Sequence, residues 1–223
     1  MSGLARIALS DGISVSGSDA KDSSVLTALT ALGAKVSATH EAANVEGADV
    51  VIYSTAIAAT NPEMAYAVER SIPILTRAQA LALLMKGSRS IAVAGTHGKT
   101  TTSSILGHIL YECGVDVTAF LGGIVENYNS NLIGNGKTVT VVEADEFDRS
   151  FLHLHPNMAC VTSMDADHLD IYGNSDEIEA TFVEFADKVE DKKLLFTPKS
   201  LPLKGMKIAI EEEADFTAFN IRI

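Results

Sequence analysis

The sequence has little cysteine, with two among 223 residues. Cys113 and Cys160 are far apart, and neither forms a C-x-x-C pair of the kind that zinc sites use. Both stand beside apolar residues, so we predict buried, reduced thiols in a cytosolic protein. The count and spacing exclude a disulfide framework.

Long hydrophobic runs are also absent from the sequence. No apolar stretch approaches the ~18 residues that a membrane-spanning helix needs. The chain does not open with a charged segment followed by an apolar one, as a secretory signal would. We therefore expect a soluble, cytoplasmic protein without a membrane partner.

Basic residues are scarce relative to acidic ones. The chain has 17 Lys and Arg against 29 Asp and Glu, a formal net charge of −12. Binding to nucleic acid needs clustered Lys and Arg to neutralise phosphates, so nucleic acid is excluded as a main partner. An acidic protein that binds a nucleotide must attract it locally, through Mg²⁺ and a few placed cations.

The most informative stretch is IAVAGTHGKTTTSSIL, from Ile91 to Leu106. A short apolar run, a glycine turn and a helix-length apolar stretch follow one another, which is the context of a phosphate-binding loop. The predicted nucleotide-binding residues are Gly95, Thr96, His97, Gly98, Lys99, Thr100 and Thr101. Lys99 would reach the β- and γ-phosphates and Thr100 would bind Mg²⁺. The alternative is an ordinary strand-to-helix turn that happens to contain Lys and Thr.

The first half of the sequence alternates short strands with helices. We predict strands at residues 13–17, 34–36, 48–53 (a buried strand) and 72–75, and helices at residues 1–9, 22–32, 62–70 and 78–85. Alternating units of this length indicate a parallel sheet covered by helices. Residues 87–89 mark the predicted boundary between a domain at 1–88 and a domain at 89–223.

The second half continues the pattern after the phosphate loop. We predict strands at residues 117–120, 138–142, 158–162, 194–196, 207–210 and 216–223, a helix at 177–189, and a loop at the Asn- and Gly-rich residues 126–136. Two of these strands deliver acidic clusters at their carboxyl ends, where open parallel sheets bind ligands. Glu143 ends one of them, as an acid that holds Mg²⁺ opposite Thr100 would. His168, among the aspartates after the other, could bind a second metal or be an ordered turn histidine, and residues 143–148 could be a solvated turn.

Together these motifs resemble the Mur ligases. The matching pieces are GTHGKTTT (Gly95–Thr102), EADEFDRSFL (Glu143–Leu152) and DADHLDIYG (Asp165–Gly173), with SGSD, ALGAKV, STAI and NPE upstream in the same order. The resemblance covers essentially the whole chain. It implies an α/β fold, with a Rossmann-like N-terminal domain that lacks its first strand, followed by a parallel-sheet central domain of the P-loop type.

The resemblance also implies an activity. Within the family, the match is closest to the ATP-dependent ligases that join L-alanine to UDP-N-acetylmuramate through an acyl phosphate in peptidoglycan synthesis. It assigns Lys99 to the phosphates, Thr100 and Glu143 to the Mg²⁺ of ATP, and His168 to a second Mg²⁺, so that Lys99, Glu143 and His168 are the implied catalytic residues. It assigns substrate binding to Asp19, His40 and Ser54 at the uridine diphosphate, and to Asn129 or Asn131 at the muramoyl group.

The sequence departs from the family pattern in three places. Phe147 stands where many relatives carry a small polar residue. The chain begins at the Met-Ser-Gly that follows the family's first strand and pyrophosphate-binding turn, and stops at Ile223, before the third domain. We therefore expect a fragment that is inactive by itself. The alternatives are a sister ligase that attaches a recycled tripeptide, a non-catalytic nucleotide-binding module, and a folylpolyglutamate-type ligase.

Overall fold

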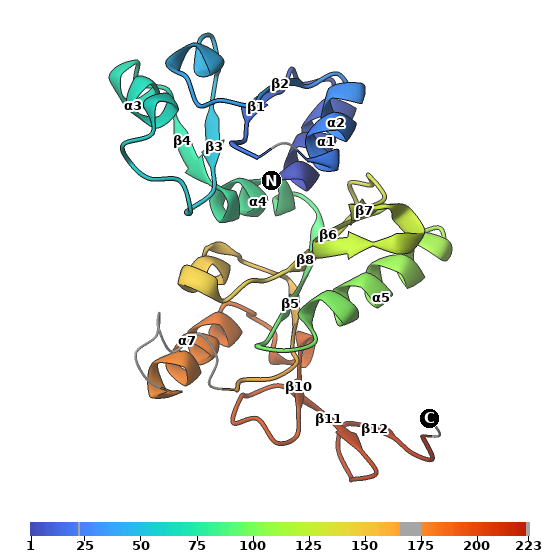
Figure 1. Ribbon diagram of the computed structural model, residues 1–223. Helices are drawn as coiled ribbons and strands as arrows, with labels where there is room; N and C mark the ends of the chain where they lie inside the picture. Colours follow the sequence, from blue (N-terminus) through green and yellow to red (C-terminus); the bar gives the residue numbers. More distant parts are fainter. Residues whose placement is uncertain (22, 166–174, 222–223) are drawn as a thin grey trace. The chain divides into compact units, whose positions relative to one another are not determined.

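The computed structural model describes residues 1–21, 23–165 and 175–221 (Figure 1). The chain divides into two compact units, Met1–Leu83 and Leu84–Ile223. Both alternate strands with helices, as the sequence pattern predicts. In the part of the chain that the structure describes, no helix is both long and apolar enough to cross a membrane.

The first unit contains short strands in two parallel ladders. Its elements are α1 (Ser2–Ser10), β1 (Ser16–Ser18), α2 (Ser24–Ala31), β2 (Lys35–Ser37), the 3₁₀ turn η1 (Ala42–Val45), β3 (Val51–Tyr53), α3 (Pro62–Glu69), β4 (Ile74–Thr76) and most of α4 (Arg77–Met85). β1 pairs with β2, and β3 pairs with β4. The prediction of a buried strand at residues 48–53 is wrong: β3 is shorter and half-buried, because among the described strands it pairs only with β4.

The second unit is built on an eight-stranded sheet in the order β12-β11-β10-β9-β5-β8-β6-β7. The strands are β5 (Arg89–Ala94), β6 (Val117–Val125), β7 (Ser130–Ile133), β8 (Val139–Glu143), β9 (Met158–Val161), β10 (Leu195–Pro198), β11 (Met206–Ile210) and β12 (Phe216–Ala218). The helices are α5 (Lys99–Glu112) and α7 (Ser175–Asp187), with the 3₁₀ segments η2 (Glu126–Tyr128), η3 (Phe147–His153) and η4 (Lys192–Leu194). Neighbouring strands are parallel except β6 and β7.

The antiparallel edge corrects one prediction. Residues 126–136 were expected to form a loop, but Ser130–Ile133 pair with β6, and only a short 3₁₀ turn and the chain after the strand are irregular. β6 also runs beyond the predicted end at residue 120, through Gly122 and Gly123 to Val125. The backbone hydrogen bonds supplied by β6 outweigh the low strand preference of Asn and Gly.

Buried apolar side chains cover both faces of the central strands. On one side, the cluster Val117, Ala119, Leu121, Ile133 and Val141 packs with Leu106 and Leu110 of α5. On the other, the buried Phe151 of η3 stacks on Phe185 of α7, with ring centroids 4.8 Å apart. Figure 1 shows α5 and α7 on opposite sides of the sheet. α5 therefore packs against β5, β6 and β8, and α7 packs against η3, the segment that follows β8.

The two cysteines differ from the prediction that both are buried. Cys113 is exposed, because it directly follows α5, where the chain leaves the helix at the surface. Cys160 lies in β9 and is half-buried, and that burial raises the pKa of its thiol. Among the described residues the structure has no disulfide, since both thiols are free.

Candidate functional site

The predicted phosphate loop connects β5 to α5, as the sequence pattern requires. β5 is buried between β8 and β9, and Gly95 follows it directly. Gly95 has φ +133°, and a Cβ there would stand 2.8 Å from the Ser163 amide nitrogen and collide with the side chain of Thr162. Only glycine therefore allows the loop to lie against the chain that follows β9.

Hydrogen bonds hold the loop to that neighbouring segment. Thr96 and His97 both contact Ser163. The hydroxyl oxygens of Thr96 and Ser163 lie 2.8 Å apart, and the His97 amide donates to the Ser163 hydroxyl at 2.8 Å. The Asp165 amide donates to the Thr96 hydroxyl at 3.0 Å. The loop is thus held through Thr96 and His97 to the segment that follows β9, and the exposed His97 ring lies 3.8 Å from the Asp165 carboxylate.

The first backbone amides of helix α5 lie at the loop. Its N-cap is Gly98, at φ 82°, a residue that has no side chain with which to cap the helix. The amides of the first turn, which includes Lys99, Thr100 and Thr101, lack partners within the helix by its geometry. Their orientation and the helix dipole favour an anion at this point.

The end of β8 supplies a carboxylate to the same place. The Thr100 hydroxyl donates to Glu143 Oε1 at 2.9 Å, and the Gly122 amide donates to Oε2 at 2.7 Å. A side chain at position 122 would collide with this carboxylate, so the glycine in β6 is what lets the two strands position it. Glu143 is therefore held by α5 and β6 together.

The spacing of these two oxygens fits Mg²⁺. Octahedral ligands at 2.0–2.1 Å from Mg²⁺ place neighbouring oxygens about 2.9 Å apart, and Mg²⁺ is usually bound by one or two carboxylates together with phosphates and waters. Among the described residues, no group of three or more His, Cys, Asp or Glu could hold a metal ion. Thr100 and Glu143 therefore form a pair suited to a metal that arrives with a phosphate ligand.

Lys99 has a partner that sequence reasoning missed. Its Nζ lies 2.8 Å from both carboxylate oxygens of Glu146 and donates to the Gly95 carbonyl at 2.7 Å. Glu146 is only 2% exposed, so the interpretation of residues 143–148 as a solvated turn is wrong for this residue. Its position in EADEFD, three residues after Glu143, was the available signal, but the sequence did not indicate which acid would face the lysine.

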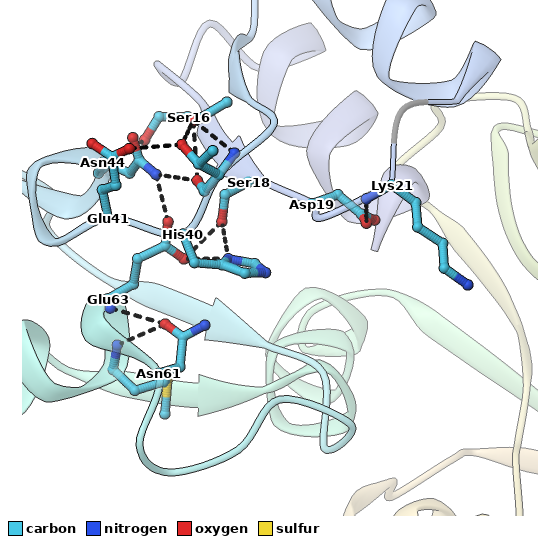
Figure 2. A network of polar contacts seen from close by, with 12 residues as sticks. Ser16, Ser18, Asp19, Lys21, His40, Glu41, Asn44, Asn61 and Glu63 are labelled. Atoms are coloured by element: carbon cyan, nitrogen blue, oxygen red, sulfur yellow. Dashed lines mark hydrogen bonds and ion pairs between the residues drawn. The ribbon is translucent and has the colours of Figure 1, made fainter.

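The predicted substrate-binding residues of the first unit follow three of its strands. Asp19 comes directly after β1, His40 three residues after β2, and Ser54 directly after β3. Asp19 is tied to β2 by its amide, which donates to Ser37 at 3.1 Å. His40 contacts Ser18 and Glu63 (Figure 2), two residues with no predicted binding role.

The remaining predicted residues lie elsewhere. Asn129 ends η2 in the left-handed conformation, at φ 45°, and Asn131 lies in β7, so both belong to the antiparallel edge beside β6. His168 lies outside the described residues.

Comparison with known proteins places both units in one family. Residues 1–89 match the profile described as Mur ligase family, catalytic domain, and residues 93–221 match that of the Mur ligase middle domain. The chain is 67% identical over 174 residues to the UDP-N-acetylmuramate–L-alanine ligase of Flavobacterium johnsoniae, covering 78% of this chain and 39% of that protein. It is 38% identical to the enzyme of the same name from Persephonella marina, covering 100% of this chain and 51% of that protein.

Solved structures of two ligases are similar to this chain over nearly all of its length. The UDP-N-acetylmuramate-alanine ligase of Thermotoga maritima superposes with a TM-score of 0.83 at 29% identity, over 95% of this chain and 50% of that one. The UDP-N-acetylmuramate:L-alanyl-γ-D-glutamyl-meso-diaminopimelate ligase from Neisseria meningitides superposes with a TM-score of 0.82 at 27% identity, over 93% of this chain and 74% of that one. The chain thus spans between about two fifths and half of the length of the two curated relatives named above.

Proposed function

The chain belongs to the Mur ligase family, and on that premise we propose that it acts in the ATP-dependent joining of L-alanine to UDP-N-acetylmuramate during peptidoglycan synthesis. In this reaction the muramoyl carboxylate oxygen forms a bond to the γ-phosphorus of ATP while the bond to the β-phosphate oxygen breaks and ADP leaves. The alanine amine then attacks the acyl carbon, phosphate leaves, and the amine loses a proton. The product is an amide.

The observation that carries the proposal is the arrangement at the start of α5. Lys99 is paired with Glu146 at the start of α5 and would move from this carboxylate to the phosphates of ATP. The amides of the first turn of α5 would face the same phosphates. Thr100 and Glu143 are 2.9 Å apart and would hold Mg²⁺. When bound, Mg²⁺ would neutralise negative charge on the phosphates of the nucleotide. We assign Gly95, Thr96, His97, Gly98 and Thr101 to the walls of the same nucleotide site.

The other substrate contacts extend the proposal. Asp19, His40 and Ser54 would bind the uridine diphosphate end, because they follow the carboxyl ends of strands from the two parallel ladders, β1 with β2 and β3 with β4, and such folds bind ligands at these ends. Asn129 or Asn131 would face the muramoyl group, and His168 would hold a second Mg²⁺. The domains that do this work would be residues 1–88 and 89–223.

The structural likeness to the tripeptide ligase supports a second candidate, in which L-alanyl-γ-D-glutamyl-meso-diaminopimelate takes the place of L-alanine. The two candidates share ATP and UDP-N-acetylmuramate and differ in the amine. The identity of 67% to an L-alanine ligase favours the first. Because we expect these 223 residues to be inactive by themselves, the two candidates are separated in a protein of the relatives' full length that contains them. Mass spectrometry would identify the product formed from each amine with UDP-N-acetylmuramate and Mg-ATP.

The nucleotide site is tested by calorimetry on the 223-residue chain. Lys99→Ala should weaken Mg-ATP binding about tenfold to a hundredfold, because a charge-assisted hydrogen bond contributes ~1.5–3 kcal/mol. Lys204→Ala removes an exposed lysine of the same unit and serves as the control. Equal affinity of the wild type and Lys99→Ala, with both folded, would refute the assignment.

A further inference from the structure

A half-buried carboxylate in the first unit contacts the predicted ligand-binding histidine (Figure 2). Glu63 Oε2 accepts a hydrogen bond from the Ser18 hydroxyl at 2.7 Å and lies 3.3 Å from His40 Nδ1. Ser18 Oγ is itself 2.8 Å from the same ring nitrogen. Asn44 Nδ2 donates to the other oxygen, Oε1, at 2.7 Å. Three atoms, one from each of Ser18, His40 and Glu63, therefore form a closed triangle.

Counting hydrogens in this triangle fixes the form of the imidazole. An ionised carboxylate can only accept, and a serine hydroxyl has one hydrogen to donate. If Ser18 donates to Glu63, His40 Nδ1 must carry a hydrogen, and all three contacts are then favourable. In the other tautomer the lone pair of Nδ1 would face the carboxylate at 3.3 Å, and Ser18 could satisfy only one of its two neighbours.

The ionised state of Glu63 has its own structural support. Burial opposes it, but hydrogen bonds from Asn44, Ser18 and His40 outweigh the burial and lower the pKa of the carboxyl. The side chain is 13% exposed and that of His40 is 24% exposed. Glu63 sits in the first turn of α3, whose N-cap Asn61 accepts from the Glu63 amide at 2.9 Å, so its backbone is also fixed.

We propose that Glu63 is a positioning residue: with Ser18 and Asn44 it keeps His40 in the tautomer that has its hydrogen on Nδ1 and presents Nε2 as a hydrogen-bond acceptor. A carboxylate hydrogen-bonded to one imidazole nitrogen is a general device for selecting the tautomer. This inference rests on the proposed function, in which His40 meets the uridine diphosphate end of the substrate.

The tautomer limits what the neutral histidine can recognise. An Nε2 lone pair needs a donor on the ligand, and a uridine diphosphate offers two kinds: the imide N–H of the base and the hydroxyls of the ribose. Phosphate oxygens are acceptors and do not fit it. His40 therefore reads the nucleoside part of the ligand.

The tautomer can be measured without any ligand. ¹⁵N-edited NMR at about pH 8, where imidazoles are ordinarily neutral, should show His40 Nδ1 as the protonated nitrogen and Nε2 as the lone-pair nitrogen, with His40→Gln identifying the signals. Glu63→Gln should shift both nitrogens toward the average of a mixed population. Glu69→Gln removes an exposed carboxylate at the other end of α3 and should leave them unchanged. A hydrogen on Nε2 in the wild type, or an unchanged spectrum in Glu63→Gln, would overturn the proposal.

Binding measurements separate this role from a structural one. Glu63→Gln should weaken UDP-N-acetylmuramate binding about tenfold, by analogy with metal-binding histidines, where losing the orienting partner costs about 10–100-fold. Ser18→Ala, which leaves the carboxylate in place, should give a smaller loss and keeps the test open if Glu63→Gln does not fold. If the wild type binds no UDP-N-acetylmuramate, the proposed function fails while the NMR result still decides the tautomer.

Two modified nucleotides identify the donor. N3-methyl-UDP lacks the imide hydrogen, and 2′,3′-dideoxy-UDP lacks the ribose hydroxyls. In the wild type, one of these analogues should bind more weakly than UDP. In His40→Gln, the same analogue and UDP should bind with equal affinity. If His40→Gln lowers the affinity for UDP and both analogues by the same factor, His40 does not read a donor of the nucleoside and the proposal fails.

Discussion

Replacing Glu146 by Gln should tighten nucleotide binding, although the nearby acid Glu143 is expected to be needed for the binding of Mg-ATP. Glu146 is 2% exposed and holds Lys99 Nζ at 2.8 Å with both oxygens. Phosphates must therefore compete with this carboxylate for the lysine. Gln keeps the shape and one acceptor oxygen but removes the charge that competes.

The size of the effect follows from the general strength of hydrogen bonds between charged groups. A hydrogen bond between charged groups contributes about 1.5–3 kcal/mol, and 1.4 kcal/mol is a factor of ten in affinity. We expect ADP without Mg²⁺ to bind the Glu146→Gln variant about tenfold to a hundredfold more tightly than the wild type. The same change should lower the free energy of unfolding by about 3 kcal/mol, since the largely buried Lys99 loses its ionic partner.

Calorimetry with ADP in the absence of Mg²⁺ measures the first effect and urea denaturation the second. In a Lys99→Ala background the gain from Glu146→Gln should largely disappear, because the competition acts through the lysine. Glu190→Gln, an exposed acid of the same unit, is the matched control for net charge. Unchanged or weaker ADP binding by folded Glu146→Gln would refute the reasoning and show that Lys99 keeps its partner when phosphate binds.

Two other predictions concern groups away from the nucleotide. The pKa of the Asp116 carboxyl lies below its usual 3.8, chiefly because the Thr138 hydroxyl donates a hydrogen bond to it. The carboxylate therefore stabilises the fold above pH 3.8, and this stabilisation is lost as the pH falls through the lower pKa of the folded state. The free energy of unfolding of Asp116→Asn, measured with urea, should consequently change less with acid over this range than that of the wild type. Cys113 is exposed, whereas burial raises the pKa of the Cys160 thiol. A thiol reagent at neutral pH should therefore modify Cys113 much faster than Cys160, and a Cys113→Ser variant that still reacts rapidly would contradict this.

The strand, turn and helix around the phosphate loop could be predicted because their signals are local. The apolar run at Ile91, the glycine at position 95 and the helix-forming stretch after Lys99 specify β5, the loop and α5 from neighbouring residues alone. The same holds for the carboxyl end of β8, which delivers Glu143. The prediction of an α/β architecture is confirmed for this reason.

What could not be predicted depends on partners distant in sequence. Residues 130–133 form a strand only because β6 lies beside them, and their own composition favours a loop. Glu146 is buried against Lys99, which stands 47 residues earlier in the chain. Glu63 meets Ser18 across 45 residues, while locally it looked only like part of a helix start after Asn61-Pro62. Patterns of hydrophobicity do not encode which acid faces which cation.

The central claim, that the start of α5 and the end of β8 bind Mg-ATP, is tested most directly by a crystal structure of the chain with ADP and Mg²⁺. The account predicts Mg²⁺ bound by the Thr100 hydroxyl and the Glu143 carboxylate, with Lys99 Nζ on a phosphate oxygen and moved from its place against Glu146. A nucleotide bound away from Gly95–Thr101, or Mg²⁺ that contacts neither Thr100 nor Glu143, would contradict it.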